Sequence, residues 1–184
     1  MANFTHRIAT EADIPALIAL MDRSITGPLA AFLTSEQIAA SRELMGLDSQ
    51  IIADRTYIIA EADGMLAGGG GWSGRITEYG GDHTPGRVPA PLTPGVDAPR
   101  IRAMYTAPEF VRRGVGRMIL GLCEAAARAA GYDRAELVAT LAGEPLYRAA
   151  GYAEIERFED YRGGAPVPLV RMGKRLVGHP GEPG

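Results

Sequence analysis

The chain has 184 residues, a net charge of -3 and 46% hydrophobic residues, which suits one globular domain with a sizeable core. This charge provides no basic surface for nucleic acid or an acidic membrane, and no apolar run reaches the roughly 18 residues of a membrane span. The single cysteine, Cys123, excludes an internal disulfide, and no Cys/His cluster has the spacing of a metal site. We expect a soluble, cytoplasmic protein without a metal, a nucleic-acid partner or a membrane.

The first half of the chain predicts a strand, two helices and a β-hairpin. A capping box from Thr10 to Asp13 starts the first helix, and Thr34 or Ser35 starts the second. The glycine run 68–71 lies in a predicted strand, where it indicates a bulge or a close backbone approach. In chain order we predict a strand at 4–8, a helix from 10 to about 21, a helix at 35–45, and strands at 56–61 and 65–73.

The second half begins with a Gly/Pro-rich stretch over residues 74–99, long for a loop in a compact domain and therefore expected to be functional or mobile. We interpret it as an insertion within one domain covering residues 1–184. A strand–helix–strand unit over residues 100–140 predicts a right-handed crossover between parallel strands. Further along we predict strands at 100–106, 135–140, 153–158 and 167–175, and helices at 115–130 and 144–150. Together the elements predict a mixed α/β sheet.

A glycine-bearing turn at Val111–Arg117 lies where a predicted strand ends and a helix begins. Gly114 and Gly116 permit close approach, and the N–H groups of a helix start point toward one spot. Arg112, Arg113 and Arg117 add cationic donors suited to phosphate. The turn indicates a diphosphate site, although an ordinary crossover turn with solvated arginines would look the same. The glycine spacing fits neither a P-loop nor a Rossmann site.

Two runs resemble the acetyl-CoA signatures of the GCN5-related N-acetyltransferases, the GNAT superfamily. MYTAPEFVRRGVGR at 104–117 is similar to the family's Gln/Arg-x-x-Gly-x-Gly/Ala loop around the CoA pyrophosphate, and TLAGEPLYRAAGY at 140–152 to its Asn-x-x-Ala-x-x-Phe-Tyr-x-x-x-Gly-Phe run. Residues 7–15 and 172–176 resemble its first and last strands. The resemblance covers nearly the whole chain except 74–99. It implies a mostly antiparallel sheet of about six to seven strands flanked by about four helices.

The chain departs from the family pattern at four positions. Val111 stands at the Gln/Arg position, which removes a side-chain contact but keeps the N–H groups. Thr140 replaces the common Asn and still offers a hydroxyl, and Gly143 replaces Ala. Arg100 occupies the position on the fourth strand where several members have a glutamate base.

The resemblance implies direct attack of a neutral amine on the acetyl-CoA thioester, with acetyl-CoA as co-substrate. Backbone N–H groups around Tyr105 and Thr106 would bind the pantetheine and polarise the carbonyl. Tyr147 matches the tyrosine that protonates the leaving thiolate; alternatively, it packs its helix onto the sheet. The residues expected to bind acetyl-CoA are Tyr105, Thr106, Arg112, Arg113, Gly114, Val115, Gly116, Arg117, Thr140 and Tyr147.

The general base stays open at this point. His83 has a suitable ordinary pKa, although a lone loop histidine is commonly just exposed. A water chain needs no side-chain base at all. The side-chain candidates are Glu61, Glu78, Asp82, His83 and Asp97.

Several residues expected near the acceptor amine allow two interpretations each. Arg100 and Arg102 share one face of their strand and would meet a substrate carboxylate or phosphate, or form ion pairs with neighbouring strands. Trp72 would line the acceptor pocket or pack in the core. By resemblance, the segment Ser24–Leu33 would form the other wall of that pocket.

The function favoured by the sequence is N-acetyl transfer to a small-molecule or peptide amine. One alternative is a non-catalytic, regulatory acyl-CoA-binding module on the same fold, motivated by Arg100. Another is a generic phosphate- or nucleotide-binding α/β domain, supported by the arginine–glycine turn alone. The acceptor cannot be read from the sequence, and a homodimer is left open.

Overall fold

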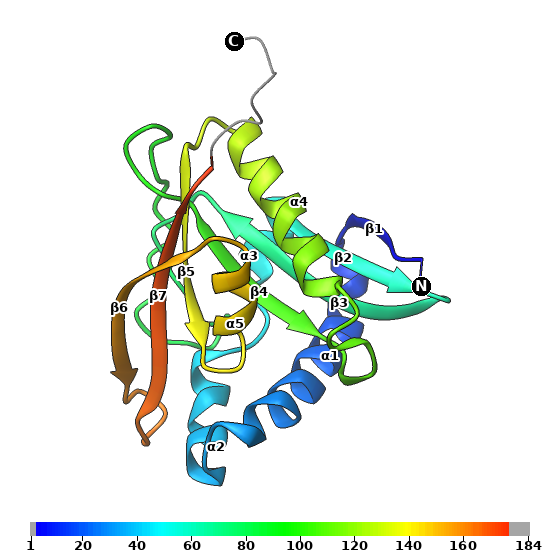
Figure 1. Cartoon of the computed structure of the whole chain (residues 1–184), viewed down its shortest axis with the longest axis vertical. Helices are drawn as coiled ribbons and strands as arrows, with labels where there is room; N and C mark the ends of the chain where they lie inside the picture. Colours follow the sequence, from blue (N-terminus) through cyan, green and yellow to red (C-terminus); the bar gives the residue numbers. More distant parts are fainter. Residues whose placement is uncertain (1–2, 177–184) are drawn as a thin grey trace.

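The computed structural model describes residues 3–176, which form a seven-stranded sheet flanked by helices (Figure 1). The strands lie in the order β1-β2-β3-β4-β5-β7-β6. They are β1 (Thr5–Ile8), β2 (Tyr57–Ala62), β3 (Met65–Ser73), β4 (Arg100–Thr106), β5 (Arg134–Thr140), β6 (Ala153–Asp160) and β7 (Val167–Arg175). The α-helices are α1 (Ile14–Thr26), α2 (Ser35–Leu44), α3 (Ser49–Ala53), α4 (Val115–Ala129) and α5 (Glu144–Ala149).

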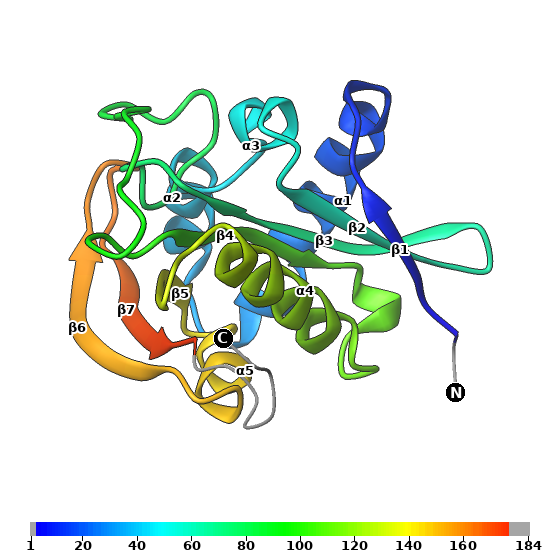
Figure 2. The ribbon, with the colours of Figure 1, turned by 90° about the horizontal axis from the view of Figure 1, so that it is seen from above.

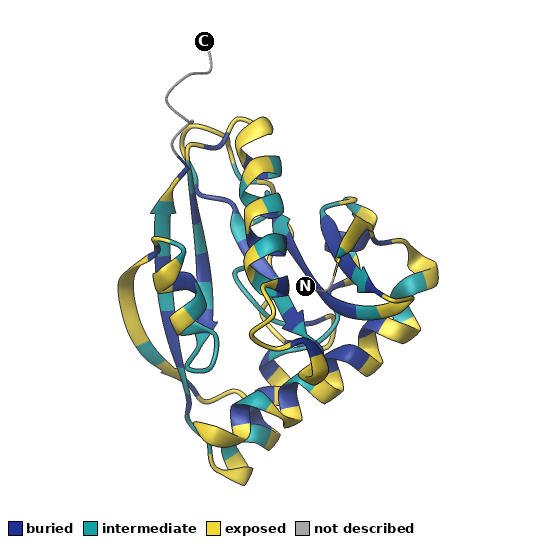
Figure 3. Cartoon of the chain, turned by 45° about the vertical axis from the view of Figure 1, so that its right-hand side comes forward, coloured by how far each residue is buried: buried dark blue, intermediate teal, exposed yellow. Residues whose placement is uncertain are grey.

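Helices cover both faces of the sheet. Figure 2 shows α1, α2 and α3 on one side, and α4 and α5 on the other. Strands β4 and β5 pair in parallel and every other neighbouring pair of strands is antiparallel, so the predicted crossover through α4 is confirmed. Buried residues concentrate along the central strands, while the outer sides of α1 and α4 and the edge strand β6 are exposed (Figure 3).

The predicted elements agree with the structure except for one helix. Both capping boxes form: the Asp13 carboxylate accepts the Thr10 N–H at 2.8 Å, and Thr34 Oγ1 accepts the Gln37 N–H at 3.2 Å. The short helix α3 was not predicted, because five residues give too little periodicity to recognise. It begins after Asp48, whose carboxylate accepts the Gln50 N–H at 3.0 Å.

The glycine run in β3 allows close packing on both faces of the sheet. A Cβ at Gly68 would lie 2.7 Å from Val115 Cγ1, on the α4 side. A Cβ at Gly69 would lie 2.7 Å from the hydroxyl oxygen of Tyr57, whose ring crosses the opposite face. These separations are too short for any side chain. The close approach expected from the sequence is confirmed.

The 74–99 segment is irregular but held by specific bonds. The Ile76 N–H donates to the Ala90 carbonyl at 2.9 Å, and the Arg75 guanidinium donates two hydrogen bonds to the Asp54 carboxylate at 2.6 and 2.8 Å. Because its backbone is anchored to itself and to the end of α3, the segment presents a defined surface to the rest of the domain.

Candidate functional site

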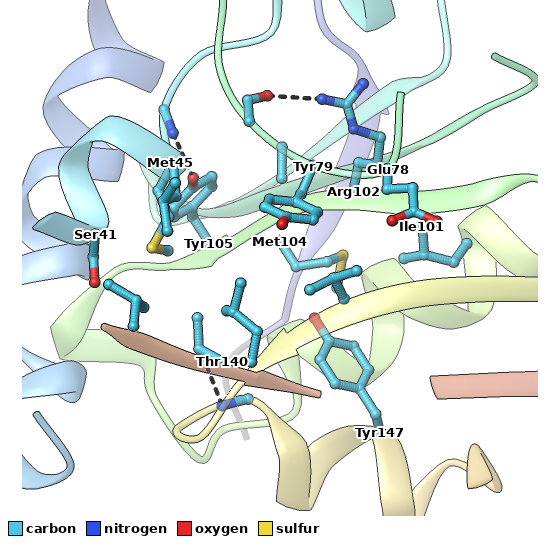
Figure 4. A pocket seen from close by; sticks show the side chains of 18 residues that line it. Ser41, Met45, Glu78, Tyr79, Ile101, Arg102, Met104, Tyr105, Thr140 and Tyr147 are labelled. Carbon is cyan, nitrogen blue, oxygen red and sulfur yellow. Dashed lines mark hydrogen bonds between the residues drawn. The ribbon is translucent and has the colours of Figure 1, made fainter. Parts of the chain in front are cut away.

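Strands β4 and β5 separate after a short paired stretch. They are hydrogen-bonded neighbours only at Arg100 with Glu136 and at Ile101 with Leu137. Beyond that point a cavity of about 120 Å3 lies between them, walled by β4, β5, α5, β7, the end of α2 and the 74–99 segment (Figure 4). The splay of two parallel strands thus opens a site at their carboxyl ends, where ligands commonly bind in such sheets.

A bulge in β4 shapes the floor of this cavity. Gly69 pairs with Tyr105 and Gly71 with Arg102, so two β4 residues face the single residue between those glycines. One of them, Ala103, has a left-handed φ of 51°. The Tyr57 hydroxyl donates to the Ala103 carbonyl at 2.9 Å. The phenol therefore holds the bulge in its strained conformation.

The predicted phosphate turn lies at the start of α4. Gly114, the residue before the helix, has φ 91°, a conformation that glycine adopts at low cost. The N–H groups of a first helical turn lack partners within the helix and can bind an anion. Arg112, Arg113 and Arg117 are exposed around them, whereas the Val115 side chain is buried in the core. Val115 is 1% exposed as a whole residue, so its side chain offers no contact to a ligand.

Thr106 lies between the turn and the cavity. A Cβ at Gly116 would lie 3.8 Å from Thr106 Oγ1 and 3.0 Å from Leu146 of α5. Thr106 follows Tyr105 in β4, and Tyr105 lines the cavity. The turn at the start of α4 and the cavity are therefore neighbouring parts of one surface.

Three of the predicted cofactor-binding side chains line the cavity: Tyr105, Thr140 and Tyr147. The Tyr105 hydroxyl accepts the Gly46 N–H at 2.9 Å, which ties β4 to the end of α2. Thr140 Oγ1 accepts the Gly143 N–H at 3.2 Å, leaving its own proton available for donation. Burial raises the pKa of Tyr105 to about 12.

The Tyr147 hydroxyl points into the cavity toward Met104 (Figure 4). Its ring is buried and packs edge-on against Tyr152, with ring centroids 6.0 Å apart. Within residues 3–176 the hydroxyl has no hydrogen-bond partner. Burial raises the pKa of Tyr147 well above its ordinary value, so the phenol is protonated at neutral pH. The packing reading therefore agrees with the structure, while the acid role of the hydroxyl stays a prediction.

Glu78 is the one side-chain base candidate whose residue lines the cavity, counted over the described part of the chain. It comes from the 74–99 segment and its side chain is 30% exposed. Arg171 of β7 contacts its carboxylate at 2.8 Å and Arg100 contacts it at 3.7 Å. A carboxylate from the 74–99 segment therefore lies next to Arg100 at the cavity wall.

The other four base candidates are bound elsewhere. Glu61 pairs with Arg7 at 3.1 Å near the β1 edge of the sheet, and Asp82 pairs with Arg87 at 2.9 Å. The His83 imidazole lies 2.7 Å from the Arg42 carbonyl, and the Asp97 carboxylate accepts the Thr93 N–H at 2.7 Å.

Both strand arginines form ion pairs, which decides between their two readings. Arg100 pairs with Glu136 of β5 as well as with Glu78. Arg102 pairs with the fully buried Asp48 and donates to the Gly80 carbonyl at 2.7 Å. Of the two readings, the structure supports the one in which Arg100 and Arg102 form ion pairs and not the one in which they meet a substrate anion.

Of two further expectations for the acceptor side, the core reading of Trp72 agrees with the structure, whereas the wall expected at Ser24–Leu33 is wrong. Trp72 packs against Tyr132, with ring centroids 6.0 Å apart, and does not line the cavity. No residue of Ser24–Leu33 lines it either; the helical wall is formed by residues 41–46 at the end of α2. Within the described chain, α2 crosses toward β7 and so places its C-terminal end over the splay (Figure 2).

Tyr79 and Met45 line the cavity but were not singled out from the sequence. The Tyr79 hydroxyl donates to Asp160 at 2.7 Å, and burial together with that carboxylate raises its pKa to about 12. The one available signal was an aromatic residue next to Glu78 in a glycine-rich loop. The sequence contains no such signal for Met45, because a methionine at a helix end commonly packs in the core.

Comparison with known proteins yields a family and a set of similar folds. A model of the acetyltransferase (GNAT) domain matches residues 53–154, more than half of the chain. No curated protein sequence matches significantly. None of the helices within residues 3–176 has the length and apolar character that a membrane crossing needs.

Several solved structures share the fold at low sequence identity. A GCN5-related N-acetyltransferase from Rhodopseudomonas palustris is 20% identical with a TM-score of 0.70, over 95% of this chain and 97% of that chain. PaiA N-acetyltransferase from Thermoplasma acidophilum, solved with coenzyme A, is 15% identical with a TM-score of 0.61, over 94% and 99%. YncA from Salmonella typhimurium, solved with acetyl-CoA, is 16% identical with a TM-score of 0.60, over 99% of both chains.

Proposed function

Because the chain belongs to the family of GNAT acetyltransferase domains, we propose that it transfers an acetyl group from acetyl-CoA to a primary amine of a small molecule or peptide. The observation that carries this proposal is the cavity at the β4–β5 splay, whose walls include a protonated phenol, Tyr147, and a carboxylate, Glu78. These are the two proton-transfer groups that amide formation from a thioester needs.

The residues at the start of α4 fit the pyrophosphate of acetyl-CoA. The first-turn N–H groups and the exposed guanidinium groups of Arg112, Arg113 and Arg117 offer a cluster of anion donors. The splay between β4 and β5 leaves main-chain groups of both strands without a partner strand, suited to the pantetheine amides. Acetyl-CoA supplies an activated acyl group as a thioester.

The proposed chemistry is a direct transfer. Glu78, alone or through a water molecule, accepts a proton from the ammonium form of the acceptor, and the neutral amine nitrogen forms a bond to the thioester carbonyl carbon. The carbon–sulfur bond breaks, and Tyr147 donates its hydroxyl proton to the departing sulfur. The nitrogen then releases its excess proton, which restores the Tyr147 phenol directly or through water. Main-chain N–H groups near Tyr105 and Thr106 stabilise the negative charge that develops on the carbonyl oxygen. The products are an N-acetyl amide and free CoA.

The test is an assay with acetyl-CoA and a panel of amines, following free thiol and the mass of the product. We expect amine-dependent thiol release together with a 1:1 amount of acetylated amine. Tight acetyl-CoA binding in calorimetry without transfer to any amine would instead support the non-catalytic acyl-CoA-binding module.

Tyr147→Phe tests the acid. We expect kcat to fall by about 10²-fold or more, the usual contribution of general acid catalysis, while the Kd for acetyl-CoA stays within about twofold. An unchanged kcat would remove the acid role from Tyr147.

Glu78→Gln tests the base, with Glu61→Gln as the matched control outside the cavity. We expect kcat/KM to fall by about 10²-fold at neutral pH for the first variant and to stay unchanged for the second. The deficit should shrink as the pH approaches the pKa of the amine, because the amine then arrives neutral. A deficit that is independent of pH would contradict the base role.

A further inference from the structure

The cavity wall is mainly apolar. Side chains from α2, β4, β5 and β7 contribute aliphatic and thioether groups, namely Leu44, Met45, Ile101, Met104, Val138 and Leu169. The charged residues of the wall, counted within residues 3–176, are Glu78 and Arg102. An acceptor in this cavity would therefore meet one carboxylate, one guanidinium and a hydrophobic surface.

The guanidinium is already occupied. The side chain of Arg102 is 3% exposed and pairs with Asp48, whose side chain is fully buried. Its other terminal nitrogen donates to the Gly80 carbonyl, and Figure 4 shows the group pointing away from the middle of the cavity. A substrate carboxylate would have to displace Asp48 from a buried ion pair, which is strongly unfavourable.

The guanidinium groups behind the wall are occupied as well. Arg100 pairs with Glu136 and Glu78, and Arg171 pairs with Glu78 and Glu156. Each therefore already faces two carboxylates. An anionic group on the acceptor would be desolvated next to Glu78 without a cation to compensate it.

We propose that the acceptor is an apolar monoamine that carries no carboxylate or phosphate. This inference rests on the proposed function and specifies its acceptor class. The ammonium of the incoming amine is attracted to Glu78, and the hydrocarbon body is buried against the aliphatic wall. Each buried methylene should raise kcat/KM by about fourfold, the equivalent of about 0.8 kcal/mol.

Matched acceptors that differ only in the acid group test the proposal: 3-methylbutylamine against leucine, and phenethylamine against phenylalanine. Leucinamide is the control, because it keeps the substituted α-carbon of leucine but replaces the carboxylate with an uncharged amide. With rates expressed per concentration of neutral amine, we expect kcat/KM for each amine to exceed that for its amino acid by about 100-fold or more. Leucinamide should lie within about tenfold of 3-methylbutylamine. Amino acids that react as well as the amines would overturn the proposal.

Binding to the protein saturated with CoA, measured by calorimetry, separates this inference from the proposed function. Tighter binding of the amines than of the amino acids, with no transfer to any of them, would overturn the proposed transfer and leave the acceptor class standing. Equal binding within the pairs, or no binding of any amine, would overturn the acceptor class whatever the transfer assay shows.

A charge-introducing variant gives a second test. Met45 is half-buried at the end of α2, so Met45→Lys places an ammonium at the cavity wall with little change in length. We expect the preference for 3-methylbutylamine over leucine to fall by at least about tenfold. Met65→Lys, at an exposed position of the β2–β3 hairpin, is the control and should leave the preference unchanged. An unchanged preference in Met45→Lys, in a variant that melts cooperatively, would also contradict the proposal.

Discussion

The two sides of the cavity present different chemical groups. On the α4 side the features expected to bind the cofactor are main-chain groups, positioned by a glycine in a left-handed conformation and by two strands that separate, together with the exposed arginines of the turn. On the opposite side the wall is made of side chains from α2 and the 74–99 segment, held by buried or half-buried ion pairs. A constant ligand such as a diphosphate can be bound largely by the backbone, whereas a variable acceptor requires side chains that differ between proteins.

The largest effect is expected from breaking the ion pairs of the acceptor side. Asp48→Asn leaves the guanidinium of Arg102 buried without its counter-charge, which should lower the free energy of unfolding by about 3–5 kcal/mol. Asp22→Asn is the control, because the Asp22–Arg42 pair is exposed and should contribute less than about 1 kcal/mol. Urea titrations measure both, and equal small losses would show that the acceptor wall does not depend on its buried pair.

Alkaline pH acts on the tyrosines around the splay. Burial raises the pKa of Tyr105 to about 12 and also raises the pKa values of Tyr57 and Tyr147. In the unfolded chain these phenols ionise near pH 10, so their contribution to stability is complete below pH 10 and is lost as the pH rises toward the folded-state values. For Tyr105 the loss should reach about 2 kcal/mol by pH 12.

Urea midpoints measured from pH 8 to pH 11 check this dependence. The chain has one lysine, Lys174, so amine titration contributes little in this range. A midpoint that stays constant up to pH 11 would mean that the phenols are not buried as described.

Tyr57→Phe tests the hydrogen bond between β2 and the bulge in β4. Removing the hydroxyl leaves the Ala103 carbonyl without this donor, which should cost about 1–3 kcal/mol of stability. We also expect kcat to fall more than the KM for acetyl-CoA rises, because the bulge loses its fixed orientation. The control is Tyr132→Phe, whose hydroxyl donates at 3.3 Å to the Leu92 carbonyl outside the cavity. Equal effects of the two substitutions on kcat would contradict the positioning role of Tyr57.

The smallest effects come from two glycines near and within α4, for which the same substitution should have opposite signs. Gly114→Ala places a Cβ at φ 91° and should cost about 1–2 kcal/mol while weakening acetyl-CoA binding. Gly121→Ala, at an exposed position of the helix with nothing near the new Cβ, should stabilise by about 0.5–1 kcal/mol and leave binding unchanged. Thermal melts and calorimetry with acetyl-CoA measure stability and binding in both variants. Weaker acetyl-CoA binding in both would contradict a specific role of the turn at Gly114.

The same contrast explains which features were predictable from the sequence. The strands, the crossover and the glycine turn were predicted because they depend on local periodicity and on residues with unusual backbone freedom. In α4 the apolar spacing alone would place Val115, Ile119 and Leu122 on the buried face, whereas the structure buries Val115, Ile119 and Cys123. Which of two neighbouring helix residues faces the core depends on tertiary packing.

The acceptor side could not be predicted in the same way. Asp48 and Arg102 lie far apart in the sequence, and a buried ion pair between them leaves no local pattern. Glu78 was one of five candidates, and only the fold of the 74–99 segment places it on the cavity wall. Choosing Glu78 from the five base candidates therefore required the arrangement of strands and loops in space.

A crystal structure of the protein with acetyl-CoA would test the central proposal most directly. We expect the pyrophosphate on the N–H groups of residues 113–117, the pantetheine between β4 and β5, and the thioester sulfur roughly 3 Å from the Tyr147 hydroxyl. The side of the acetyl group facing Glu78 should be open to the cavity. A thioester bound away from the splay, or a Tyr147 hydroxyl turned away from the sulfur, would contradict it.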